Sequence, residues 1–139
     1  MPQEIGLSVK QLVEAAREVI EEITVEEAMN LVEDDSVVIV DIRDVRELQR
    51  DGKIPGSFHC PRGMLEFWID PASPYHKAIF AGDKKFVFHC ASGWRSALAT
   101  EVAQRMGLRP VAHIGGGFSG WKKAGGPVEM PELGWAATD

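Results

Sequence analysis

The chain has 139 residues, of which 45% are hydrophobic and 26% are charged, and its formal net charge at pH 7 is −6. These values describe one globular domain with its own core, not a disordered or membrane-embedded chain. The acidic balance argues against nucleic acid or an anionic membrane as a partner, because both require a basic surface. The chain also lacks an apolar run long enough to span a bilayer and a signal-peptide pattern at its start, so we expect a cytoplasmic protein.

Two helix starts are predicted near the N-terminus by capping boxes. Ser8 with Gln11 and Thr24 with Glu27 each place a hydroxyl three residues ahead of a side chain that reaches back to the cap. Apolar residues at helical spacing run from Val9 to Ile23 after the first start. The expected organisation has three parts: an N-terminal helical extension at 1–23, a compact module at 24–128 and a loosely ordered tail at 129–139. The sequence leaves open whether the first helix packs on its own module or on a second copy.

Four short apolar runs predict the strands of a sheet. They are rich in β-branched or aromatic residues and lie at 37–40, 57–60, 86–89 and 111–114. Helices are expected between Asp44 and Gly52, at about 95–106 and around 118–124, with short helices in the aromatic stretch 64–83. Strands that alternate with helices indicate an α/β fold, with a mostly parallel central sheet flanked by helices on both faces.

The segment after the third strand carries the candidate chemistry. That strand delivers Cys90 to the carboxyl edge of the sheet, where open α/β folds place their ligands. Small residues follow, and a helix-forming run begins directly after them, so several backbone N–H groups point at one spot that favours negative charge. Because such a site stabilises a thiolate, Cys90 is predicted to be a nucleophile. Arg95, which is always charged, is placed to hold an oxyanion.

The segment 89–96, His-Cys-Ala-Ser-Gly-Trp-Arg-Ser, resembles the active-site loop of rhodanese sulfurtransferases, with Cys-x-x-Gly-x-Arg-Ser at its centre. Three further segments resemble motifs of that family in the expected order. They are Asp41-Ile42-Arg43 with Glu47, then 52–61 with its Ile-Pro-Gly core, and Gly116-Gly117-Phe118 with Trp121. The resemblance extends from about Thr24 to Val128. The chain departs from the pattern at Lys53, where histidine is usual, and at Cys60, just before Pro61.

The resemblance implies a rhodanese-like fold and a double-displacement reaction. The Cys90 thiolate would attack the outer sulfur of a donor such as thiosulfate, release sulfite and hold the sulfur as a persulfide. Cyanide, a thiol or a partner protein would then accept that sulfur, and neither a metal nor an organic cofactor is implied. The residues expected to bind substrate are Arg95, Ala91, Ser92, Gly93, Trp94 and Ser96. Those expected to have structural roles near the site are Asp41, Arg43 and Glu47.

Two other functions remain as alternatives. Cys-based phosphatases and arsenate reductases use His-Cys-x-x-Gly-x-x-Arg, whereas four residues separate Cys90 from Arg95, one fewer than in that motif. The shorter loop favours a single sulfur over a tetrahedral phosphate. A non-catalytic rhodanese-like binding module is the second alternative, although such modules commonly lack the cysteine that this chain retains.

Several residues near the motifs have ordinary structural explanations. Arg43 is expected to pair with Glu47 one helical turn along, and Asp41 to accept hydrogen bonds from nearby backbone N–H groups. Cys60 is expected to be a structural residue at a strand end, with a resolving thiol as the alternative. For Trp94, a place at the pocket mouth and a cover over apolar surface are both left open.

Two further motif matches are set aside. The pairs His59-Cys60 and His89-Cys90 match no familiar zinc spacing, and adjacent strand residues point to opposite faces. The segment 115–120 contains G-x-G-x-x-G, but in the last strand–helix unit and not the first, where a dinucleotide fold needs it. We expect those glycines to form the turn that lets Trp121 pack.

Overall fold

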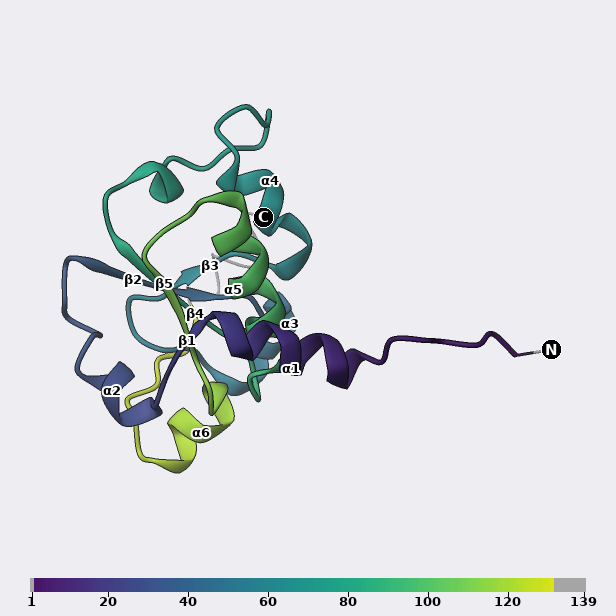
Figure 1. The fold of residues 1–139 in the computed structure, drawn as a ribbon. Helices are drawn as coiled ribbons and strands as arrows, with labels where there is room; N and C mark the ends of the chain where they lie inside the picture. The colour runs from purple at the N-terminus through teal and green to yellow at the C-terminus, as the bar shows by residue number, and fades with distance from the viewer. Residues whose placement is uncertain (1, 132–139) are drawn as a thin grey trace.

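The computed structural model describes residues 2–131 and is built around a parallel five-stranded sheet (Figure 1). The strands are β1 (Glu21–Ile23), β2 (Val37–Asp41), β3 (Phe58–His59), β4 (Lys85–His89) and β5 (Val111–Ile114). Their order across the sheet is β1-β5-β4-β2-β3, and every neighbouring pair is parallel. The central β4 therefore ends between β2 and β5, which places Cys90 in the middle of the carboxyl edge.

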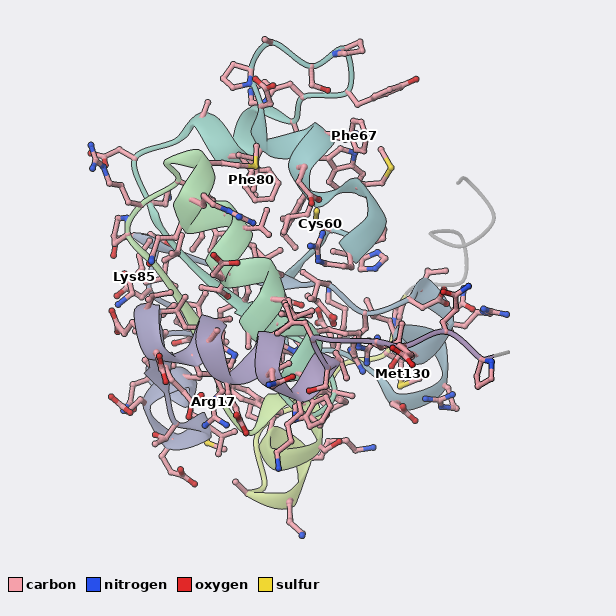
Figure 2. All side chains as sticks on the ribbon, turned by 45° about the vertical axis from the view of Figure 1, so that its right-hand side comes forward. Arg17, Cys60, Phe67, Phe80, Lys85 and Met130 are labelled. Carbon is pink, nitrogen blue, oxygen red and sulfur yellow. The ribbon has the colours of Figure 1, made fainter. Side chains whose placement is uncertain are left out.

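Helices cover both faces of this sheet, as the alternation of elements predicted. The helices are α1 (Val9–Val19), α2 (Val25–Met29), α3 (Val45–Asp51), α4 (Leu65–Ile69), α5 (Trp94–Met106) and α6 (Gly117–Lys123), with 3-10 turns η1 (Arg62–Met64) and η2 (Ala78–Ala81). On one face Phe86 and Phe88 pack beneath α4, η2 and α5; on the other, Val87 and Ala112 pack against α2 and α6. Figure 2 shows Phe80 and Cys60 on the α4 side of the molecule. The α/β fold class is confirmed.

The edge strand β1 is the element that the sequence did not predict. Helical spacing was expected to continue to Ile23, but α1 ends at Val19 and Ile23 pairs with Ile114 of β5. Two of the three residues of β1 are glutamates, and only Ile23 is buried. An edge strand of this length buries so little that its sequence carries almost no strand signal.

The first helix packs on its own chain, against α5, as Figure 1 also shows. Val13 and Ala16 of α1 are buried with Ala97 of α5, while the opposite side of α1 is exposed. The capping boxes of Ser8 and Thr24 are both present. Helix, edge strand and module thus form one packed unit over the described residues.

Near the other end, Glu129 forms an isolated antiparallel bridge with Lys53. The expectation of a loosely ordered tail falls mostly on 132–139, which lie outside the described residues. Among residues 2–131, no helix has both the length and the apolar character needed to cross a membrane.

Candidate active site

Cys90 lies where β4 meets the loop that begins α5, and its side chain is only 1% exposed. Its Sγ accepts hydrogen bonds from the backbone N–H groups of Gly93, at 3.2 Å, and Ser96, at 3.3 Å. Gly93 caps α5 with φ +106°, a conformation that turns its N–H back toward the sulfur. A Cβ on Gly93 would lie 2.4 Å from the carbonyl oxygen of Gly115. The loop therefore requires glycine here for both conformation and space.

The turn between β5 and α6 supports the cysteine loop from behind. The N–H groups of Phe118 and Ser119 donate to the carbonyls of Cys90 and Ala91, at 2.8 and 2.9 Å. Gly117, with φ +61°, lies so close to the loop that a Cβ would come within 2.5 Å of the Ala91 oxygen. The glycines at 115–120 were expected to form the turn that lets Trp121 pack; what the structure shows is that Gly117 lets two loops touch.

Arg95 is held by Glu47 of α3, across a large gap in sequence. Nη1 and Nη2 of Arg95 donate to the two carboxylate oxygens of Glu47 at 2.9 and 3.0 Å. The hydrogen bonds from Arg95 lower the pKa of Glu47, and those to Glu47 raise the pKa of Arg95, to which Cys90 adds a smaller electrostatic contribution. The Glu47 carboxylate thus fixes the Arg95 guanidinium beside the loop. The guanidinium has further N–H groups with which it can bind an anion.

The expected pair between Arg43 and Glu47 is wrong. Arg43 is buried and donates through Nε and Nη2 to Asp41, at 3.0 and 2.7 Å, and through Nη2 to the carbonyl of Gly52 at 2.8 Å. Its guanidinium also lies over the ring of Phe118, 4.2 Å from the centroid. Glu47 is paired with Arg95, and the buried Arg43 is paired with the buried carboxylate of Asp41. As expected, Asp41 also accepts from a nearby backbone N–H, that of Arg43, at 3.0 Å.

The outer side of the cysteine loop is exposed and bears both a cation and an aromatic ring. The side chain of Arg95 is 43% exposed, Trp94 is 47% exposed and Ser92 is also exposed. Trp94 lies outside the buried clusters, which favours a place at the mouth of the site over a role as a core cover. The exposed part of the cysteine loop thus combines a positive charge with an aromatic surface.

Cys60 has the surroundings of a structural residue. It is fully buried at the end of β3, and burial raises the pKa of its thiol to about 12. A resolving thiol must ionise readily, so this environment favours the structural explanation. Within the described part of the chain, histidine, cysteine and carboxylate side chains do not gather in threes or more where a metal ion would bind.

A hydrogen-bonded chain that the sequence did not predict runs from the sulfur to the surface. The Cys90 thiol donates to Ser96 Oγ at 3.6 Å, and Ser96 Oγ lies 2.9 Å from Nδ1 of His113. Nε2 of His113 lies 2.8 Å from Oε1 of Glu22. The one available signal was a histidine inside the apolar strand 111–114, since a buried imidazole requires partners.

Known proteins that resemble this chain include rhodanese-like domains and proteins named thiosulfate sulfurtransferases. Residues 24–124 match the model of the rhodanese-like domain. A mitochondrial thiosulfate sulfurtransferase of Saccharomyces cerevisiae is 30% identical over 78% of this chain and 77% of its own length. A thiosulfate sulfurtransferase/rhodanese-like domain-containing protein of Mus musculus is 27% identical over 71% of this chain, which covers 66% of that protein. A solved structure from Rhodopseudomonas palustris, described as a protein of unknown function and possible tyrosine phosphatase, is 61% identical with a TM-score of 0.90, covering 93% of this chain and 99% of that one.

Proposed function

Because the chain belongs to the family of rhodanese-like domains, we propose that it is a sulfurtransferase that carries sulfur as a persulfide on Cys90. The observation that carries this proposal is the pair of backbone N–H groups, from Gly93 and Ser96, directed at Sγ. These donors at the start of a 13-residue helix stabilise negative charge on sulfur, first as thiolate and then as persulfide. The names of the yeast and mouse relatives support the same reaction class.

The reaction has two displacements. The Cys90 thiolate attacks the outer sulfur of thiosulfate or a related donor, the donor's sulfur–sulfur bond breaks, and sulfite leaves with the electron pair. A thiophilic acceptor such as cyanide or a thiol then attacks the outer persulfide sulfur and releases Cys90 as thiolate. Arg95, oriented by Glu47, holds the anionic end of the donor, and Trp94 flanks its path.

We propose that this chemistry takes place in a reducing compartment such as the cytoplasm. Both cysteines are free thiols, and the reaction requires Cys90 to stay reduced between turnovers. Neither displacement draws on a group other than the side chains and backbone described, the donor and the acceptor.

The test is the intact mass of the protein after treatment with thiosulfate. We expect wild type to gain the mass of one sulfur atom and Cys90→Ser to gain none. Cys60→Ala is the matched control, because it removes the other thiol and should still accept sulfur. Sulfur gained by Cys90→Ser but lost in Cys60→Ala would overturn the assignment.

Phosphatase activity is the second candidate, because the 61% identical structure is described as a possible tyrosine phosphatase. Against it stand the short spacing between Cys90 and Arg95 and the engagement of Arg95 with Glu47. Hydrolysis of p-nitrophenyl phosphate that disappears in Cys90→Ser, without any sulfur uptake, would replace our proposal with this one. Absence of both activities in a folded protein would favour a binding module.

A further inference from the structure

The hydrogen-bonded chain behind Cys90 has the chemistry of a proton path. Its members come from four elements: the loop after β4, Ser96 of α5, His113 of β5 and Glu22 of β1. Cys90, Ser96 and His113 are each at most 1% exposed, whereas the side chain of Glu22 is 35% exposed. These hydrogen bonds thus connect the buried sulfur of Cys90 to solvent.

The sheet register brings the two outer members together. Glu22 and His113 are direct partners in the parallel pairing of β1 with β5. Their neighbours Ile23 and Ala112 belong to the opposite face, so Glu22 and His113 both lie on the face covered by α5. This is also the face toward which Cys90 and Ser96 point.

The direction of each hydrogen bond follows from what each atom can do. A carboxylate can only accept a hydrogen bond, so Nε2 of His113 is protonated and donates to Glu22. Nδ1 of the neutral ring is then an acceptor for the Ser96 hydroxyl, whose oxygen accepts from the Cys90 thiol. Along this side-chain path, each donor points away from Cys90 and toward the surface.

Charges around His113 suit this direction. Burial lowers the pKa of His113 and so keeps the resting ring neutral, with Nδ1 free to accept a hydrogen bond, while the Glu22 carboxylate raises the pKa and favours the imidazolium once a proton arrives. Burial alone would raise the pKa of Glu22, but hydrogen bonds from Arg17 and His113 outweigh it and keep the carboxylate charged. The polar and charged groups around the ring are Glu22 of β1, Arg17 of α1 and Ser96 of α5, while the neighbouring β4 residue is a phenylalanine.

We propose that Ser96, His113 and Glu22 take the proton from the Cys90 thiol and so generate the nucleophile. The S–H bond breaks, its proton passes to Ser96 Oγ, and the hydroxyl proton of Ser96 moves to Nδ1 of His113. The electron pair stays on sulfur as thiolate, and Glu22 balances the imidazolium. Ser96 is the catalytic member because it touches the reacting sulfur, and His113 and Glu22 are positioning residues that act through it.

Glu22 gives the path an outlet. With Glu14, Arg17 and Glu18, it lines a surface hollow of about 450 Å³. Arg17, labelled on α1 in Figure 2, donates two hydrogen bonds of 2.9 Å to the Glu22 carboxylate and orients it. Only the Glu22 carboxylate thus separates a proton on His113 from bulk water.

The test is the rate of Cys90 alkylation by iodoacetamide as a function of pH, followed by peptide mass. We expect Ser96→Ala and His113→Gln to raise the pH midpoint of this rate by roughly one unit, which lowers the rate below the midpoint about tenfold. Glu22→Gln should shift it in the same direction. Glu21→Gln is the matched control, since it removes the same charge one residue along, where the carboxylate pairs with Lys85 at the surface.

Unchanged midpoints in folded Ser96→Ala and Glu22→Gln, or an equal shift in Glu21→Gln, would overturn the proposal. Glu22→Gln alters only a surface side chain, so the test survives if His113→Gln does not fold. The proposal rests on Cys90 being the nucleophile of the proposed function. Shifted midpoints without sulfur uptake would reject sulfur transfer and keep the proton path. Sulfur uptake with unshifted midpoints would keep sulfur transfer and reject the proton path.

Discussion

Around Cys90, small differences in backbone position decide the chemistry. The two N–H donors stand at 3.2 and 3.3 Å from Sγ because Gly93 turns the chain with a positive φ and lies against Gly115. Arg95 takes its place from Glu47, which also caps its own helix by accepting from the N–H of residue 44. The contacts of Gly93 with Gly115 and of Arg95 with Glu47 join residues of different elements, so the residues near the sulfur act as a set.

Replacing Gly93 with alanine should inactivate the site. The new Cβ would lie 2.4 Å from the Gly115 oxygen, so the loop must move and its N–H groups must leave the sulfur. We expect sulfur transfer to fall by about 100-fold, as a displacement near 1 Å can cause. Steady-state kinetics with thiosulfate and cyanide will measure it.

Gly107→Ala provides the control for that prediction. Gly107 ends the same helix with φ +105°, nearly the value at Gly93, but a Cβ there would meet nothing within 4 Å apart from its neighbours in the chain. Both variants should lose about 1 kcal/mol of stability from the backbone conformation. Equal activity of the two variants would show that the contact with Gly115 is not what positions the loop.

At the scale of elements, the end of β2 is held by a buried ion pair. Asp41 and Arg43 are at most 1% exposed, and the arginine also reaches the carbonyl of Gly52 and the ring of Phe118. The pair therefore joins β2 to the end of α3 and to α6. Burial alone would raise the pKa of Asp41, but His89 and the Arg43 guanidinium outweigh it, so the pKa is lowered.

Asp41→Asn should destabilise the protein strongly. The substitution leaves Arg43 buried without its counter-charge, which costs about 3–5 kcal/mol. Urea denaturation followed by circular dichroism will measure the loss. Asp51→Asn is the control, because it removes an equal charge from an exposed pair with Arg50 and should change little. A small loss in Asp41→Asn would show that the buried pair contributes no net stability.

The same pair predicts how stability depends on pH. Because the folded pKa of Asp41 lies below its ordinary value of 3.8, its contribution is present above that pH and is lost as the pH falls through the folded pKa. Wild type should therefore lose more stability between pH 5 and pH 3 than Asp41→Asn does. Parallel losses in both proteins would contradict the assignment.

At the scale of the whole molecule, the N-terminal segment completes the fold. Helix α1 covers α5 through Val13 and Ala16, and β1 extends the sheet beyond β5. The family match begins at residue 24, so both elements precede it, yet Glu22 touches His113 behind the active site. Residues that precede the family match thus contribute to the environment of Cys90.

Ala16→Asp tests the docking of α1. A charge at this position, 3% exposed, would be buried without a partner against α5, and we expect a loss of about 3 kcal/mol. Ala15→Asp places the same charge one residue earlier on the exposed side of α1 and should leave the melting temperature nearly unchanged. Thermal denaturation of both variants will check this; equal stability would mean that α1 is not docked in solution.

The sequence by itself determined what depends on neighbours along the chain. Capping boxes at Ser8 and Thr24, four apolar strands and the spacing from Cys90 to Arg95 are local patterns, and the elements they predict are present in the structure. The cysteine loop was recognisable because its turn and helix start lie within a few residues.

Only the tertiary structure decided which distant residues meet. Glu47 could have paired with either arginine, and burial of Arg43 beside Asp41 left it to Arg95. The edge strand β1 and the contact of His113 with Ser96 depend on sheet register and helix packing, which join residues far apart in the chain. Such pairings are selected by the packing of the whole domain, and no local pattern specifies them.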